Sequence, residues 1–572
     1  MKKLSSFLCI CCMLVSLQTV SQTLKWNKKL SNAIFTIVTY DKDDKIQNTG
    51  NGFFIRPDGE AVSDYALFKG AERAIIVTNE GKEMAVDRIL GANEMYDIIK
   101  FHVNIQGKKV QALPLANQPA QVNEKVWLLP YSTSKEATHQ QGIVTEVVPV
   151  NEQYHYYTLQ LTANEKAISC PIVNAEGMVV GIMQQPITNE DGKTCYAVDA
   201  NYASSLTIGA LTSNHSSLRA IGIKKALPPT EEEALVLIYM KAGQTNKEEY
   251  LELLNEFIET YPNSAEGYQR RATLYTEQYK DSVHFELAEA DIAKALELNE
   301  NKADVYHTLC RMIYQNCIGE QPLKYKDWGL KKSLESIQQA IAIDSLPLYL
   351  QTEGELLFAL QDYTKAYEAY KFVNESNMAT ALTFYSAAKS LQLSGQVNQD
   401  EEIIRLLDQA VNTYAKPYPI EAAPYIWERG KAYVNANQFR QAVMDFNEYH
   451  KLVNGKVNAT FYYQREQAAI AGRMNQLALD DIAKAIELDS TNANYYAEQA
   501  SLFVRFKMVE EAIVSCKKAL ELDPDYADCY RILGICYIQQ KKEEDACKQF
   551  TRAKELGDEQ ADKLIQKYCL KK

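Results

Sequence analysis

The stretch KAISCPIVNAEG, residues 166–177, places a hydroxyl and a thiol side by side at Ser169 and Cys170. Either group becomes a nucleophile when an imidazole takes its proton and a carboxylate orients that imidazole. The first half of the chain offers four candidate bases, which are His102, His139, His155 and His215. A base must also meet the required geometry, so a structural role in the core or at the surface is the simpler interpretation of each histidine.

The elements that must position these residues are short runs rich in β-branched and aromatic side chains. They fall within residues 33–206 and are separated by turns such as Pro57-Asp58-Gly59. The runs are AIFTIVTY, GFFI, AIIVT, IIKFHV, KVWLLPY, GIVTEVV, YYTLQL, MVVGIM and CYAV. This pattern predicts an antiparallel all-β unit, either a barrel or a sandwich.

The chain changes its rhythm after residue 206. Residues 207–229 are polar and irregular and end in Leu227-Pro228-Pro229, and Thr230 then precedes three glutamates. A proline pair followed by a threonine cap and acidic residues is typical of a helix start. We therefore predict a linker over 207–229 and helices from residue 230 onward.

The helical region repeats itself. LAEADIAKALELN at 287–299 and LALDDIAKAIELD at 477–489 agree at most positions, and copies that begin at Ala459, Ala493 and Ala527 are 34 residues apart. Looser copies begin at Ala265, Ala303, Pro347, Ala381 and Ala423. The period and residue types resemble the tetratricopeptide repeat. The resemblance implies an all-α solenoid of about nine helical hairpins over 230–558, with 559–572 as a capping helix.

Composition and the N-terminus bear on location and partners. The 572 residues carry a net charge of −13, which disfavours nucleic acid as a partner because its binding requires a basic face. Residues 1–21 combine two lysines, an apolar stretch and a polar exit, as a secretory signal peptide does. We expect an exported bacterial protein of the periplasm or cell envelope, or a secreted one, without an integral membrane segment.

Cysteine usage fits an exported chain. Three of the twelve cysteines belong to the signal peptide, and the remaining nine cannot all pair within one chain. Cys170 and Cys195 are predicted as a candidate disulfide of an oxidising compartment. Cys529 and Cys536 fall on one predicted helix, about 10.5 Å apart along its axis, so they cannot bridge each other.

Three segments of the β-rich region occur in a recognisable order. They are NTGNGFFIRPDGEAVSDYALFKGAERAIIVT, GANEMYDIIKFHV and SCPIVNAEGMVVGIM. Together they resemble the trypsin-like serine peptidases of the high-temperature-requirement kind. The resemblance implies an all-β double barrel over residues 22–206. It also implies that the positions of the catalytic triad are Tyr65, Asp97 and Ile168.

Two of those three residues do not suit the chemistry. Tyr65 replaces histidine, and a phenol with a pKa of about 10 is a poor base at pH 7. Ile168 offers no nucleophile, and Lys166 replaces a glycine of the oxyanion loop. A shift of register would bring Ser169 or Cys170 to the nucleophile position, still without a base.

We therefore predict an exported protein–protein interaction scaffold, in which a peptidase domain without activity is joined to a repeat array that binds a peptide or protein on its concave face. The family lines that face with the first helix of each hairpin, which implies five contacts: Trp427, Lys431, Tyr463, Gln467 and Arg531. The alternative is an active serine or cysteine endopeptidase with a rearranged site and substrates recruited by the repeats. We expect no metal and no cofactor, because the sequence contains no motif for either.

Overall fold

The structure is a computed structural model that describes residues 30–133, 139–184, 193–299 and 301–570. The chain divides into two compact units, Met1–Arg271 and Ala272–Lys572. The predicted signal peptide, residues 1–21, lies outside the described residues. Among the helices of the described ranges, none has both the length and the apolar character needed to cross a membrane.

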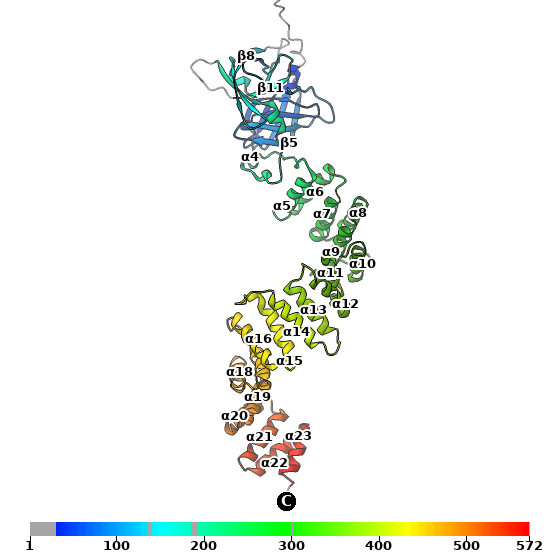
Figure 1. Ribbon diagram of the computed structural model, residues 1–572, viewed down its shortest axis with the longest axis vertical. Helices are drawn as coiled ribbons and strands as arrows, with labels where there is room; N and C mark the ends of the chain where they lie inside the picture. The colour runs from blue at the N-terminus through cyan, green and yellow to red at the C-terminus, as the bar shows by residue number, and fades with distance from the viewer. Residues whose placement is uncertain (1–29, 134–138, 185–192, 300, 571–572) are drawn as a thin grey trace, which may run out of the picture. The chain divides into compact units, whose positions relative to one another are not determined.

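The strands of the first unit form two closed barrels (Figure 1). The first barrel has the strand order β1-β2-β3-β6-β5-β4, and the second has the order β10-β11-β12-β9-β8-β7. All neighbouring strands are antiparallel. Their bounds are β1 Ile34–Tyr40, β2 Ile46–Phe54, β3 Glu60–Ser63, β4 Arg73–Thr78, β5 Glu83–Asn93, β6 Ile98–Val103, β7 Lys125–Leu128, β8 Gln140–Pro149, β9 His155–Gln160, β10 Pro171–Val173, β11 Val179–Met183 and β12 Thr194–Asp199. The predicted all-β double barrel is confirmed.

Alternate residues of the first-barrel strands enter two different cores. On β2, Phe54 packs inside the first barrel, whereas Phe53 packs in a cluster that contains residues of both barrels. On β6, Ile99 and Ile98 divide in the same way. Successive strand residues point to opposite faces. Strands at the seam between the barrels are therefore apolar on both faces, and the seam is part of the hydrophobic core.

The segment predicted as a linker, 207–229, is instead packed against the first barrel. It contains the short helices η4 (Thr212–Asn214) and α4 (Ser216–Arg219), which follow α3 (Ala200–Ser205). Its apolar side chains join the first-barrel core, namely Ile208, Leu218, Ile221 and Ile223. These residues have no regular period, so their burial could not be read from the pattern of polar and apolar residues.

The first helical hairpin belongs to the same unit as the barrels. It consists of α5 (Glu231–Lys241) and α6 (Lys247–Thr260). Glu256 of α6 forms an ion pair with Lys224 at 2.9 Å and lies 3.8 Å from Arg88 of β5. The hydroxyl of Tyr261 donates to the carbonyl of Pro228 at 2.6 Å. Thr230 therefore caps the first helix of the hairpins, but it is not a boundary between compact units.

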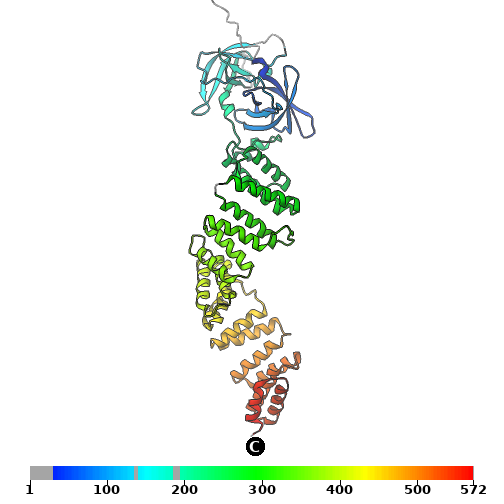
Figure 2. The same cartoon turned by 90° about the vertical axis from the view of Figure 1, so that its right-hand side faces the viewer.

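The remaining helices pair in sequence as further hairpins, which lie side by side in both views (Figure 1, Figure 2). Their bounds are α7 Ala265–Leu274, the π-helix η5 Tyr275–Tyr279, α8 Ser282–Leu298, α9 Ala303–Ile318, α10 Leu330–Ile343, α11 Pro347–Ala359, α12 Tyr363–Asn374, α13 Ala381–Leu393, α14 Asp400–Asn412, the 3-10 helix η6 Ile420–Ala422, α15 Ala423–Asn435, α16 Phe439–Leu452, α17 Ala459–Ala471, α18 Asn475–Leu488, α19 Ala493–Arg505, α20 Val509–Leu522, α21 Ala527–Gln539, α22 Glu543–Glu555 and α23 Glu559–Tyr568. The first helices of eight hairpins begin at the eight residues from which the repeats were counted.

Inside some of the hairpins, a glycine of the first helix faces an aromatic ring of the second helix. A Cβ atom added at Gly430 of α15 would lie 2.7 Å from the ring of Phe446 on α16, and one at Gly354 would lie 3.1 Å from the ring of Tyr370. An aromatic ring fills the space beside the eighth residue, so a side chain at Gly430 would force the Phe446 ring to move and one at Gly354 would crowd Tyr370. In the hairpin that begins at Ala459, the eighth residue is Glu466 instead of glycine, and Ile482 replaces the aromatic residue.

In three successive hairpins, a polar side chain of the first helix bonds to one of the second helix. In the hairpin of α17 and α18, the guanidinium of Arg465 donates to both oxygens of Asp481, at 2.7 and 2.8 Å. Arg429 and Asp445 make the same bidentate pair one hairpin earlier. One hairpin later, the hydroxyl of Ser515 donates to Oε1 of Gln499 at 2.8 Å. The charged pair and the neutral pair therefore occupy equivalent positions of the repeat.

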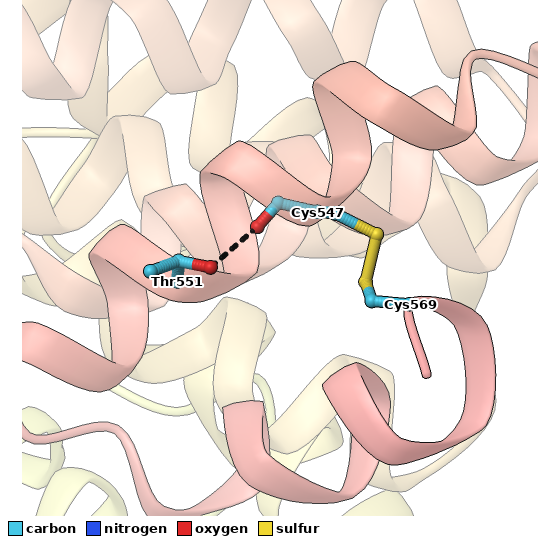
Figure 3. Close-up of a disulfide and its surroundings, with 3 residues drawn as sticks. All are labelled: Cys547, Thr551 and Cys569. Atoms are coloured by element: carbon cyan, nitrogen blue, oxygen red, sulfur yellow. Dashed lines mark hydrogen bonds between the residues drawn. A yellow bond between two sulfur atoms is a disulfide. The ribbon is translucent and has the colours of Figure 1, made fainter. Parts of the chain in front are cut away.

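The C-terminal helix is fastened by a disulfide. Cys547 of α22 is bonded to Cys569, just after α23, and the hydroxyl of Thr551 donates to the Cys547 carbonyl at 2.8 Å (Figure 3). The predicted disulfide between Cys170 and Cys195 is wrong, because both thiols are free and buried. Cys170 precedes β10 and Cys195 lies on β12, and β11 separates these strands. Two strand spacings amount to about 9.6 Å, more than a disulfide can span.

The repeated bridge predicts a sharp difference between two sets of substitutions. Arg465→Met leaves the carboxylate of Asp481 buried without a partner, so it should lower the free energy of unfolding by about 3–5 kcal/mol. The double change Arg465→Gln with Asp481→Ser copies the neutral pair of the next hairpin and should cost less than half as much. Urea unfolding followed by circular dichroism compares the variants. Equal losses for the single and double variants would contradict the equivalence.

Candidate functional site

The candidate peptidase site lies at the seam between the barrels. The first barrel contributes the end of β3 and the turn η2 (Tyr65–Leu67), together with Asp97 before β6. The second barrel contributes residues 164–170, which lead into β10. Asn51 of β2 connects the two, since its Nδ2 donates to the carbonyl of Lys166 at 2.8 Å and lies 3.2 Å from that of Ile168.

Residues 164–170 form a closed turn in which the amides of residues 166–168 bond within the turn. The 3-10 helix η3 (Glu165–Ala167) is capped by Asn164, whose Oδ1 accepts from the amide of Lys166 at 3.1 Å. The amides of Ala167 and Ile168 donate to carbonyls of the same turn, at 2.9 and 3.3 Å. An oxyanion hole requires amides that point at the substrate oxygen. In this turn the amides of both Lys166 and Ile168 are occupied.

Ser169 is fully buried and its hydroxyl donates to a carboxylate. The acceptor is Oδ1 of Asp64, at the end of β3 in the other barrel. The hydroxyl of Ser63 lies 3.1 Å from the same oxygen and 2.6 Å from the carbonyl of Asn51. Ser169 has a positive φ of 62°, and its amide donates to the Met183 carbonyl at 2.8 Å. This serine is therefore fixed from both its side chain and its backbone.

The carboxyl group of Asp64 is itself perturbed by this environment. Burial raises its pKa to about 6, with the nearby charge of Asp97 adding to the rise, while hydrogen bonds from Ser169 and Ser63 oppose it. A carboxyl with this pKa carries its proton for much of the range below neutral pH. Its side-chain partners are the hydroxyls of Ser169 and Ser63, and no imidazole bonds to it among the described residues.

Asp97 binds backbone rather than a base. Its Oδ1 accepts from the amide of Ala66 at 2.7 Å, and burial raises its pKa although the amides of Ala66 and Tyr65 lower it. The Tyr65 phenol is buried and donates to the carbonyl of Ser217 at 3.0 Å. Burial also raises the Tyr65 pKa, so the phenol is neutral. Asp97 accepts from the amides of Tyr65 and Ala66. The Tyr65 hydroxyl bonds to Ser217 instead, and Ala66 carries only a methyl group.

Two histidines of this half bond to other side chains: Nδ1 of His102 lies 2.6 Å from Asp87, and Nδ1 of His215 lies 3.0 Å from the Ser217 hydroxyl. Nδ1 of His155 is buried 4.0 Å from Asp199 and makes no hydrogen bond among the described residues. His139 directly precedes β8. Cys170 is buried beside Ser169, and burial raises its thiol pKa to about 12, which disfavours the thiolate needed for nucleophilic attack.

The described residues bring no set of three or more His, Cys, Asp or Glu side chains into an arrangement that could hold a metal ion. In the repeat array, the five residues predicted as partner contacts do lie on first helices of hairpins, namely α15, α17 and α21. Lys431 is paired with Glu428 at 2.7 Å, and Nε2 of Gln467 donates to Glu466 at 2.7 Å. Arg531 is paired with Asp558 at 2.5 Å. Trp427 and Tyr463 are half-buried.

Sequence reasoning missed three residues of the seam. Asp64, Asn51 and Asn164 hold the turn closed, and none of them belongs to the predicted triad. The signal available was a polar residue at a strand end, as Asp64 is after the apolar pair Ala61 and Val62. Such a residue is common in turns, so it did not distinguish a site.

Comparison with known families agrees with this architecture. Residues 50–182 match the family model described as a trypsin-like peptidase domain, and residues 515–548 match that of the tetratricopeptide repeat. No curated protein matches the chain. The predicted order of a trypsin-like peptidase domain followed by tetratricopeptide repeats is confirmed.

The buried carboxyl of Asp64 predicts a pH dependence of stability. Its pKa of about 6 in the folded state exceeds the unfolded value of about 3.9, so the folded state binds this proton more tightly. The stabilisation is complete below about pH 4 and is lost as the pH rises to about 6, a change of about 2–3 kcal/mol. Asp64→Asn should remove this slope and make the protein more stable than wild type at pH 7.5.

Urea unfolding of the full chain at pH 4.5, 6 and 7.5 measures this difference. Asp43→Asn is the matched control, because Asp43 is exposed and its removal should leave the slope unchanged. An Asp64→Asn variant whose stability stays parallel to that of wild type at all three pH values would contradict the assignment.

Proposed function

We propose that the protein is an exported interaction scaffold, in which a peptidase-fold domain that does not cleave peptide bonds is joined to a repeat array that binds protein partners. The observation that carries the proposal is the bond from the Ser169 hydroxyl to Asp64, within a turn whose amides are already used. A nucleophile must face the substrate and a base, whereas this hydroxyl is buried and faces a carboxyl group.

The rate factors that the missing groups normally contribute support the proposed loss of peptidase activity. A single oxyanion donor contributes about 10²–10³ in rate, and the amides of Lys166 and Ile168 both bond within the turn. General base catalysis contributes a further factor of about 10²–10⁴, and neither Tyr65 nor Ala66 supplies a base beside Asp97. The factors multiply, so the remaining rate would be orders of magnitude below that of a peptidase.

The repeat array supports a binding role. Stacked hairpins present an extended surface, and half-buried aromatic residues such as Trp427 and Tyr463 are the kind of side chain that dominates protein interfaces. Ion pairs already hold Lys431 and Arg531, so these two are poorer candidates for contacts than the aromatic residues. A protein or peptide is therefore the partner we propose, and nucleic acid is disfavoured by the net charge of −13.

The disulfide between Cys547 and Cys569 supports the proposed location. Disulfides persist in oxidising compartments such as the periplasm or the extracellular space. The closed loop spans 22 residues, for which chain entropy gives a stabilisation of about 3 kcal/mol. A protein made for the cell envelope gains stability from such a bond, whereas in a reducing cytosol the bond would be absent.

An activity-based probe tests the proposed absence of peptidase activity. The purified mature chain is incubated with a fluorophosphonate probe and, separately, with unfolded casein. We expect neither labelling nor cleavage, because Ser169 is buried and lacks a base. The matched control is Ser169→Ala. Labelling or cleavage that this substitution abolishes would establish an active peptidase and overturn the proposal.

Thiol labelling in cells tests the proposed location. Whole cells are quenched with acid, denatured and alkylated with a maleimide of known mass, before and after reduction. We expect reduction to add two labels per chain, and a Cys547→Ser, Cys569→Ser variant to add none. A chain that is fully labelled without reduction would place the protein in a reducing compartment.

A further inference from the structure

A cavity of about 740 Å³ opens in the repeat array outside the peptidase domain. It lies between α15, the end of α16 and the start of α17. Its volume is within the range of ligand sites in proteins. Of the five partner contacts predicted from sequence, only Trp427 lines it.

The floor of the cavity is a packed set of aromatic rings. The ring of Trp427 lies 5.1 Å from that of Tyr449 and 5.6 Å from that of Phe461, and the latter two are 5.7 Å apart. Phe461 is buried, whereas Trp427 and Tyr449 are half-buried and expose part of their rings. Each ring is fixed by its neighbours, so the floor is ready to receive an apolar side chain without reordering.

The rim of the cavity is positive and polar. Lys456 is exposed, and no ion pair or side-chain hydrogen bond to it occurs among the described residues. Two other lysines of these hairpins are paired, Lys431 with Glu428 at 2.7 Å and Lys451 with Glu448 at 3.8 Å. None of the residues that line the cavity carries a carboxylate, and Asn458, Thr460 and Gln464 add uncharged polar side chains.

We infer that this cavity binds an extended segment of a protein partner that carries an aromatic or large aliphatic residue beside an aspartate or glutamate. The apolar side chain contacts the aromatic floor, and the carboxylate pairs with Lys456. Basic segments are disfavoured because the cavity offers them no acid, although the chain as a whole is acidic. The inference rests on the proposed function, since it specifies what the array binds.

A random peptide library displayed on phage tests this specificity. It is selected on the full-length protein and on four variants, each checked for its circular dichroism spectrum and melting temperature. Thr460→Trp fills the cavity from an exposed position, with Thr460→Ser as its control. Lys456→Glu reverses the charge at the rim, with Lys451→Glu as its control outside the cavity.

We expect the wild type and both controls to enrich an aromatic or large aliphatic residue next to an acidic one. Peptides of that type should bind Thr460→Trp at least tenfold more weakly, and Lys456→Glu should enrich lysine or arginine in place of the acid. An unchanged motif in both cavity variants would overturn the inference while leaving the array as a binding surface. No enrichment on the wild type would overturn the inference as well, whereas labelling by fluorophosphonate would overturn only the proposed function.

Discussion

The burial of the seam between the two barrels is the constraint on which the peptidase domain depends. Strands that meet there are apolar on both faces. Phe53 and Ile98 pack in the seam, whereas Phe54 and Ile99 pack in the interior of the first barrel. Polar groups in this dry region must find partners within the protein. Asp64 and Ser169 satisfy each other from opposite barrels, and Asn51 satisfies the carbonyls of the turn. The same seam that holds the barrels together therefore also holds Ser169, which is buried and bonded to Asp64.

The repeat array shows a second way of satisfying buried polarity. The bidentate pairs of Arg429 with Asp445 and Arg465 with Asp481 are replaced by Gln499 and Ser515 at the next equivalent position. A buried pair is costly to break but can be exchanged for another complete pair. The hairpins thus contain different polar pairs at equivalent positions, and both partners differ together. The glycines that face aromatic rings are likewise absent where the ring is absent, as at Glu466 and Ile482.

The sequence predicted the features that depend on local period and missed those that depend on tertiary contact. Strand alternation predicted the β-unit, and the 34-residue period together with looser copies of the repeat predicted the helix starts from Ala265 to Ala527. The packing of Ile208 and Leu218 in the first barrel has no period and was mistaken for a linker. The pairing of Cys547 with Cys569 joins the two ends of a 22-residue loop, which spacing alone does not reveal. Cys170 and Cys195 were misjudged because strand order is not visible in sequence.

The closed turn at residues 164–170 satisfies its own amides and is bonded to the rest of the seam. An open oxyanion loop leaves amides without protein partners, and a buried amide in that state costs about 1–3 kcal/mol. Here Asn164 and the turn carbonyls accept from those amides, so the cost is absent. Strain is confined to Ser169, whose positive φ is held by the bonds to Asp64 and Met183. Reopening the turn would require breaking these bonds inside the seam, so a single substitution such as Ile168→Ser would place a hydroxyl in the loop without creating an oxyanion hole.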